Sequence, residues 1–292
     1  MESNLAFSST EFNEGELSLF LETAQRFGVR NLELWHPKHV NSTNVAEVKE
    51  QLERSGMRCI CVSTWSQLNA DSRSVDRVLS GIDLARALGA GLTNTYFGPN
   101  SSRSSEEAVA AYVETITPAV RLAAEAGVTI VLENEFDVEG KDPECSDVTR
   151  RAEGSRAIWE AVNSPHFALT FDPGNYCCAG EEAYPLAYRT CKEAIGYIHL
   201  KDVRPYDPGK RPAGSRDKQV TEPPLKVFRD PTGKYVCVPL GEGVIDWGGL
   251  LQELKADAYD GYLTLEPHTS RELLNDSYER SLRFLADSGF AV

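Results

Sequence analysis

The sequence lacks the features that mark membrane and secreted proteins. None of its apolar runs approaches the roughly 20 residues that a membrane-spanning helix needs. Residues 1–9 also lack the basic and long apolar regions of a secretory signal. The seven cysteines are scattered without paired spacing, so neither a disulfide framework nor a cysteine-rich metal site is predicted. We therefore expect a cytoplasmic protein with reduced thiols.

Positive charge is also scarce. Lys and Arg number 30 against 44 Asp and Glu among 292 residues, which gives a formal net charge of −14. Such a charge repels polyphosphate backbones and anionic membrane surfaces, so neither nucleic acid nor a membrane is expected as a partner. With 41% apolar and 25% charged residues, the composition is that of a globular protein able to bury a large core.

Short runs rich in Val, Ile, Thr and Tyr alternate along the chain with longer stretches of helical period. The eight predicted strands are residues 4–8, 31–35, 58–64, 92–97, 129–135, 167–171, 196–203 and 261–267. A predicted helix follows each strand, for example at residues 14–27, 74–88 and 105–126. Glycines just after helical runs are predicted to be C-terminal caps, namely Gly28, Gly56, Gly89 and Gly127.

Eight strand–helix repeats predict a parallel α/β sheet with right-handed crossovers that closes into a (β/α)8 TIM barrel. Residues 1–292 are expected to form this single domain. A doubly wound open sheet is the rival architecture, and it usually carries a nucleotide fingerprint. Gly89-Ala90-Gly91 does not provide one, because it precedes a strand and lacks the third glycine.

One segment, residues 203–237, interrupts this alternation after the seventh predicted strand. It holds six of the fifteen prolines and eight basic against four acidic side chains, with no convincing period. Loops of this length in compact domains are either functional lids or disordered insertions. We expect a long, basic, Pro-rich loop that either covers the barrel mouth and attracts a carboxylate-bearing substrate or makes subunit contacts.

Ionisable residues end four consecutive core strands, and in TIM barrels the reactive groups come from the C-terminal ends of strands. They are Glu133 in Leu132-Glu133-Asn134, Asp172 before Pro173-Gly174, His199 in His199-Leu200-Lys201-Asp202, and Glu266 before Pro267. Each taken singly has a structural interpretation, such as a turn aspartate or a satisfied core histidine. Together they are predicted to converge in one arc of the barrel mouth. Three carboxylates there repel one another unless a cation is bound.

Oxygen donors with one imidazole suit a hard or borderline divalent ion. We expect one such ion per chain, Mn²⁺ in the first place, with Mg²⁺, Co²⁺ and Zn²⁺ as alternatives. Four protein ligands leave coordination positions for adjacent carbonyl and hydroxyl oxygens of a substrate. A metal in this position acts as a Lewis acid and stabilises an enediolate as negative charge develops.

In order and spacing these motifs resemble those of the sugar phosphate isomerase/epimerase family, xylose isomerase-like TIM barrels related to endonuclease IV. The resemblance covers nearly the whole chain and includes residues 171–175, 239–247 and 261–267. It implies that Glu133, Asp172, His199 and Glu266 hold one divalent metal. It also implies that Glu133 and Glu266 exchange a proton from opposite faces of a sugar, at the carbon next to its carbonyl. A homodimer or homotetramer is implied as well.

Three candidate substrate contacts are defined by comparison with this family. Glu139, six residues after Glu133, matches a position where ketose epimerases keep a glutamate that contacts the sugar. Asn175 stands where many sugar epimerases have a histidine. Pro205 stands where they often have an arginine, with Arg204 one place earlier. The sequence thus departs from the family at the sugar-recognition positions.

Other candidates follow from position alone. Residues at the ends of the second and third predicted strands are expected to wall the pocket, where aromatic faces stack on sugar C–H surfaces; they are Glu33, Trp35, His36 and Trp65. Lys201 is predicted either to hold a substrate oxygen or to pair with Asp202.

The leading hypothesis is a divalent-metal-dependent isomerase or epimerase acting on a keto sugar or related polyol. The alternative is a metal-dependent lyase on the same scaffold, such as an inosose or dehydroshikimate dehydratase or a C-glycoside-cleaving enzyme. The same enediolate can expel a β-substituent instead of being reprotonated. A DNA phosphodiesterase like endonuclease IV needs about three metals and many more histidines than the five present. A non-catalytic binding protein is the remaining alternative.

Overall fold

Eight parallel strands close into a barrel in the computed structural model, which describes residues 4–100, 102–136, 147–206, 227–230 and 233–290. Around the barrel the strands follow the order β1-β2-β3-β4-β5-β6-β7-β11. Their bounds are β1 Leu5–Ser8, β2 Asn31–His36, β3 Arg58–Gln67, β4 Leu92–Tyr96, β5 Thr129–Glu133, β6 Phe167–Phe171, β7 Ile195–Leu200 and β11 Tyr262–Leu265. The predicted (β/α)8 barrel is therefore confirmed.

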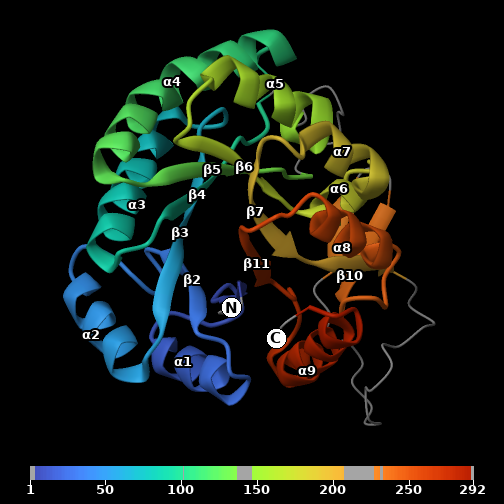
Figure 1. The fold of residues 1–292 in the computed structure, drawn as a ribbon. Helices are drawn as coiled ribbons and strands as arrows, with labels where there is room; N and C mark the ends of the chain where they lie inside the picture. The colour runs from blue at the N-terminus through green and yellow to red at the C-terminus, as the bar shows by residue number, and fades with distance from the viewer. Residues whose placement is uncertain (1–3, 101, 137–146, 207–226, 231–232, 291–292) are drawn as a thin grey trace.

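Helices form an outer layer around the strands (Figure 1). The longer ones are α1 Leu17–Arg26, α2 Val45–Ser55, α3 Val75–Leu88, α4 Ser105–Ala126, α5 Ala152–Val162, α8 Trp247–Ala256 and α9 Arg271–Asp287. Shorter pieces are α6 Pro173–Cys178, η4 Ala183–Ala187, α7 Tyr188–Cys191, η1 Ser72–Ser74 and η3 Val148–Arg150. In the described ranges no helix is both long enough and apolar enough to cross a membrane.

Apolar stripes pack the helices on the barrel, and all four glycines predicted as caps have left-handed backbone, Gly28 one residue after the C-cap Phe27 of α1. In α1 the buried residues Leu17, Phe20, Leu21 and Ala24 recur with the 3.6-residue period of a helix and so share one face. Left-handed glycines follow α2, α3 and α4 directly, at Gly56, Gly89 and Gly127. Only glycine adopts this conformation without steric cost, so these positions end their helices.

The two-residue period of a strand decides which side chains reach the barrel interior. In β5, Ile130 and Leu132 belong to the main core shared with the helices, whereas Val131 belongs to a second cluster made of strand residues. Glu133 follows two residues after Val131 and therefore lies on the same, inward side. The same alternation in β6, β7 and β11 directs Asp172, His199 and Glu266 inward.

The segment predicted as one long loop contains strands at both ends, which corrects that prediction. β8 Asp202–Pro205, β9 Val227–Asp230 and β10 Gly233–Val238 form an antiparallel sheet in the order β8-β10-β9. The predicted seventh strand, 196–203, is accordingly divided between β7 and β8. These strands pair with one another rather than with the barrel strands. Their sequences therefore do not follow the alternation of apolar strand and helix that identifies the barrel strands. Residues 207–226, on which the choice between lid and insertion falls, lie outside the described residues.

Asp202, at the start of β8, ties this small sheet to the run 239–247. Its buried carboxylate accepts backbone N–H groups of Val203 at 2.9 Å, Gly241 at 3.0 Å and Gly243 at 2.9 Å. A Cβ atom at Gly243 would lie 1.9 Å from Oδ1 of Asp202 and 2.4 Å from the carbonyl oxygen of Val203. Glycine is therefore required at position 243 by the close approach of the aspartate.

Substitution of Gly243 by alanine is expected to lower the free energy of unfolding by about 1–3 kcal/mol, because the added methyl group forces Asp202 away from its amide partners. Urea denaturation measures this change. Gly91→Ala is the matched control, since a Cβ at Gly91 meets no atom within 4 Å. Equal stabilities of the two variants would contradict the close approach.

Candidate metal centre

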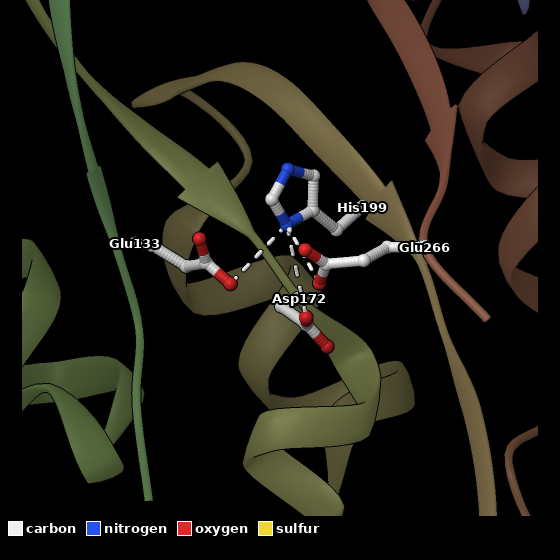
Figure 2. A group of neighbouring side chains, drawn as sticks. All are labelled: Glu133, Asp172, His199 and Glu266. Carbon is white, nitrogen blue, oxygen red and sulfur yellow. Dashed lines mark hydrogen bonds and ion pairs between the residues drawn. The ribbon is translucent and has the colours of Figure 1, made fainter. Parts of the chain in front are cut away.

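Four ionisable side chains meet at the C-terminal end of the barrel. Glu133 ends β5, Asp172 follows β6, His199 lies in β7 and Glu266 follows β11. One possible ligand atom of each lies within 4.8 Å of the other three, and all four residues are buried. Figure 2 shows Glu133 and Glu266 reaching this group from opposite sides. We refer to these four residues as the carboxylate–histidine cluster; it brings together the four residues predicted as metal ligands.

The Nδ1 atom of His199 faces all three carboxylates of the cluster. It lies 3.2 Å from Oε1 of Glu133, 3.5 Å from Oε2 of Glu266 and 3.9 Å from Oδ2 of Asp172. These contacts are the dashed lines of Figure 2. Nδ1 is thus the ring nitrogen that lies among the carboxylate oxygens.

The other ring nitrogen of His199 is held by Glu33, a residue expected only to wall the pocket. Nε2 lies 2.9 Å from Oε2 of Glu33, which also accepts the hydroxyl of Tyr197 at 2.6 Å. Ser8 donates its hydroxyl to Oε1 of Glu33 at 3.0 Å. A carboxylate that accepts the second N–H of a histidine is the usual partner of a metal-binding imidazole, because it fixes the ring and leaves the first nitrogen to the metal.

Asp172 both caps a helix and belongs to the carboxylate–histidine cluster. Its Oδ1 accepts the backbone N–H of Asn175 at 2.9 Å and so caps the start of α6. Its Oδ2 is buried and faces the cluster, where it lies 3.9 Å from Nδ1 of His199 and 2.6 Å from Nζ of Lys201. The turn interpretation and the metal-ligand interpretation of this aspartate are therefore compatible, since each uses a different oxygen.

Two asparagines fix the carboxylate of Glu133. Asn94 of β4 donates to Oε2 at 2.7 Å, and Thr170 in turn donates to the amide oxygen of Asn94 at 2.8 Å. Asn175 donates to Oε1 at 3.2 Å and to the carbonyl oxygen of Asn134 at 2.9 Å. These bonds leave the amide oxygen of Asn175 buried without a partner among the described residues.

Lys201 places its ammonium group inside the cluster. Nζ lies 2.6 Å from Oδ2 of Asp172 and 3.2 Å from Oε2 of Glu266. The alternative that Lys201 pairs with Asp202 is wrong, because the carboxylate of Asp202 is used by backbone N–H groups and Lys201 points to the other two acids. Burial opposes a charged lysine, but Asp172 and Glu266 outweigh it and hold the pKa of Lys201 well above its usual value.

Burial and neighbouring charges also oppose each other at the three carboxylates of the cluster. Burial raises the pKa of Glu266, yet the nearby His268, Lys201 and His199 hold it well below its usual value. Burial likewise raises the pKa of Glu133, but His199 outweighs it and the net pKa is lowered. Both glutamates are therefore ionised near neutral pH and able to accept a proton. For Asp172, burial prevails and raises the pKa to about 6.

His268, which belongs to none of the sequence motifs, contacts the carboxylate of Glu266. Its Nε2 lies 3.0 Å from Oε2 of Glu266, and its Nδ1 lies 3.1 Å from Oε1 of Glu11. The residue has a φ of 41°, in the left-handed region that side-chain-bearing residues seldom adopt. Such a backbone persists where its surroundings hold it, and it recurs at functional sites.

Replacement of His268 by alanine is expected to weaken divalent-metal affinity by about 10–100-fold, because Glu266 loses the group that orients its oxygen. Isothermal titration with Mn²⁺ measures the change. His36→Ala is the control, since Nδ1 of His36 bonds to the carbonyl oxygen of Val40 instead. If both variants bind Mn²⁺ as the wild type does, His268 does not position the ligand.

The other predicted substrate contacts lie at different places. Trp65, at the end of β3, is half exposed, and its ring centroid lies 5.3 Å from that of Tyr96. Arg204 is partly buried in β8, opposite Val236. His36 ends β2 and is partly buried. Glu139 lies outside the described residues.

The donor set fits a divalent ion. Three carboxylates and one imidazole are the ligands that Mn²⁺, Mg²⁺, Co²⁺ and Zn²⁺ accept, and one ligand atom of each of these four buried residues lies within 4.8 Å of the others. A site for about three metals needs more ligand groups, and the described part of the chain brings together no second group of three or more possible ligands. All five histidines lie in the described residues, and three of them bond to backbone carbonyl oxygens: His36, His39 and His166.

Comparison with known proteins agrees with this fold. The profile of the xylose isomerase-like TIM-barrel family matches residues 21–288. A search of curated proteins gives no match. A D-tagatose 3-epimerase-like protein has a similar structure, with a TM-score of 0.73 and 18% identity, and the match covers 98% of each chain.

Two further solved structures have a similar fold. The probable 3-DHS dehydratase AsbF of Bacillus anthracis matches with a TM-score of 0.70 and 16% identity over 98% of this chain and 99% of its own. The IOLI protein, solved with a bound zinc atom, matches with a TM-score of 0.72 and 17% identity over 98% and 99% of the two chains. At such identities the likeness concerns the fold, which carries more than one reaction.

Proposed function

Because the chain belongs to the xylose isomerase-like TIM-barrel family, we propose that it is a divalent-metal-dependent isomerase or epimerase. Its substrate is a keto sugar or related polyol, and its reaction moves a proton at the carbon next to the carbonyl. The observation that carries this proposal is the opposition of Glu133 and Glu266 across one buried cluster (Figure 2).

Proton transfer between two faces of one carbon needs a carboxylate on each side. Glu133 and Glu266 approach the cluster from opposite sides and are both ionised near neutral pH, so either can remove the proton while the other returns one. Fixed hydrogen bonds from Asn94 to Glu133 and from Thr10 to Glu266 hold the two carboxylates in place. We assign the acid and base roles to these two glutamates.

Glu133, Asp172, His199 and Glu266 would hold the metal, which when bound supplies Lewis acidity at the substrate oxygens. Glu33 keeps His199 in the orientation that presents Nδ1 to the cluster. Lys201 brings a fixed positive charge to the same place, where it stabilises negative charge developing on a substrate oxygen. The unpaired amide oxygen of Asn175 is positioned to accept a substrate hydroxyl.

A lyase is the second candidate, and the position of Lys201 favours it. Elimination of a β-substituent needs stabilisation of the departing oxygen as negative charge develops on it. The ammonium group of Lys201, 3.2 Å from the proposed base Glu266, is a fixed cation in a position to provide this stabilisation. The structural likeness to the probable dehydratase AsbF is compatible with this reaction but does not select it.

Incubation of the Mn²⁺-loaded protein with keto sugars and cyclitols in heavy water tests the proposal. An isomerase or epimerase is expected to yield products of the substrate's own composition that carry one deuterium on carbon. A lyase gives a product lighter by water or by an expelled group, with a new absorbing chromophore. Absence of both deuterium uptake and product across the panel would leave the enzyme proposal without support.

A further inference from the structure

Three aromatic side chains form a continuous surface at the ends of β2, β3 and β4. The ring centroids of Trp35 and Tyr96 are 6.3 Å apart, those of Trp65 and Tyr96 5.3 Å, and those of Trp35 and Trp65 6.3 Å. The planes of Trp35 and Tyr96 are 28° apart, so these two rings are close to parallel. We call Trp35, Trp65 and Tyr96 the aromatic wall.

One hydrogen-bonded chain joins the aromatic wall to Glu133. Asn94 donates to the hydroxyl oxygen of Tyr96 at 3.3 Å and to Oε2 of Glu133 at 2.7 Å. Burial, and then the charges of Glu133 and Glu266, raise the pKa of Tyr96 well above its usual value. The phenol of Tyr96 is therefore within electrostatic reach of both proposed catalytic glutamates.

A second chain joins the wall to His199. The indole N–H of Trp35 donates to the hydroxyl oxygen of Ser8 at 3.4 Å, and Ser8 donates to Glu33 at 3.0 Å. Glu33 in turn lies 2.9 Å from Nε2 of His199. Two independent chains thus place the aromatic wall beside the carboxylate–histidine cluster.

The wall runs outward from the cluster to solvent. Tyr96 is 2% exposed, Trp35 is partly buried and Trp65 is 47% exposed. Among the large apolar side chains that are exposed in the described residues, Trp65 is the only aromatic one. Arg77 donates to the carbonyl oxygen of Trp65 at 2.6 Å and so fixes its backbone. An indole held half in water beside a polar site is a surface on which a ligand ring can stack.

We propose that the aromatic wall is a subsite for a second ring of the substrate, uncharged and with a flat apolar face. The substrate is then a glycoside or similar two-ring compound whose reacting ring occupies the cluster and whose outer ring stacks on Trp65. The wall itself carries no ionised group, whereas Lys201 and His268 direct their charges to Asp172 and Glu266. The identity of the reacting ring rests on the proposed function, but the stacking surface does not.

Binding of three glucosides to the purified protein tests the subsite. Phenyl β-D-glucopyranoside carries an aromatic outer ring, cellobiose carries a sugar outer ring, and methyl β-D-glucopyranoside carries none. Calorimetric titration is expected to show at least one of the first two binding about threefold to tenfold more tightly than the methyl glucoside, the effect of one aromatic stacking contact. The stronger of the two identifies the outer ring as aromatic or as sugar.

Trp65→Ala is expected to remove this preference and Trp65→Phe to keep part of it, because the phenyl ring retains a smaller stacking face. Since Trp65 is half exposed, its replacement leaves the core intact. Trp159→Phe, a change to a partly buried tryptophan of α5, is the matched control and should leave the preference unchanged. Equal binding of all three glucosides, no binding of any, or a preference that survives in Trp65→Ala would overturn the subsite.

The heavy-water experiment separates this result from the proposed function. A preference that depends on Trp65 in a protein that takes up no deuterium supports the subsite and counts against the isomerase. Deuterium uptake into free keto sugars without any preference between the glucosides supports the isomerase and counts against the subsite.

Discussion

Replacement of Glu266 by glutamine is expected to lower the rate of isomerisation or epimerisation by about 10²–10⁴, the contribution of one positioned acid or base. The site accommodates the amide. Lys201 and His268 both approach Oε2 of Glu266, whereas Oε1 accepts the hydroxyl of Thr10 at 3.2 Å. Glutamine can keep its oxygen toward the two cations and give its NH₂ group to the Thr10 oxygen, which also accepts hydrogen bonds.

Deuterium wash-out distinguishes the two glutamates from each other. With Glu266→Gln, Glu133 still faces one side of the substrate, so the isomer whose hydrogen points to Glu133 should exchange with solvent without being converted. Glu133→Gln is expected to show the same behaviour with the other isomer. Glu272→Gln, an exposed change in α9, should alter neither rate. Exchange that is lost from both isomers in one variant and kept for both isomers in the other would indicate a single base and contradict the two-sided arrangement.

Addition of a divalent ion to the metal-stripped protein is expected to raise the free energy of unfolding by about 2.7 kcal/mol when the free ion is at 100 times its Kd. The physical reason is that the ion binds four ligand groups which only the folded chain brings together. Denaturation curves with and without Mn²⁺, Mg²⁺, Co²⁺ or Zn²⁺ measure the effect and rank the ions. Elemental analysis of the untreated protein gives the stoichiometry, expected to be about one ion per chain for four ligands.

His199→Ala is expected to abolish this stabilisation, since Nδ1 of His199 is the nitrogen ligand atom of the proposed metal site. His166→Ala is the matched control, because His166 precedes β6 at the opposite end of the barrel and bonds to the carbonyl oxygen of Val128. If none of the four ions stabilises the wild type, metal-assisted proton transfer fails and the non-catalytic binding protein becomes the better interpretation.

The barrel and the cluster could be predicted from the sequence because both follow from local rules. Short apolar runs alternating with helical stretches specify a parallel barrel, and the carboxyl ends of its strands must meet at one end. Glu133, Asp172, His199 and Glu266 each lie at or directly beside the carboxyl end of such a run, so their convergence requires no knowledge of long-range contacts. Strand ends were the least exact part, as β3 extends to Gln67 and β11 stops at Leu265.

The groups that position the cluster could not be predicted in the same way. Glu33 contacts His199 across 166 residues of sequence, from β2, which β11 and β1 separate from β7 in the barrel. His268 follows a proline, and only its left-handed backbone brings its ring to Glu266 and Glu11. The sequence presents it as one isolated histidine. The pairing of β8 with β10 was missed for a similar reason, because its partners are separated by a long segment.

The alternation of inward and outward residues along each strand has a consequence for how this protein can change. In β5, Ile130 and Leu132 pack in the core between strands and helices, while Val131 and Glu133 point into the barrel interior. Substitutions in the interior set alter chemistry and leave the contacts between strand and helix untouched. Deletion of a single residue within β5 exchanges the two sets, placing a carboxylate against the helices. Single substitutions at the inward positions can thus change the reaction without loss of the fold, whereas an insertion or deletion within a strand would disrupt both the core and the site.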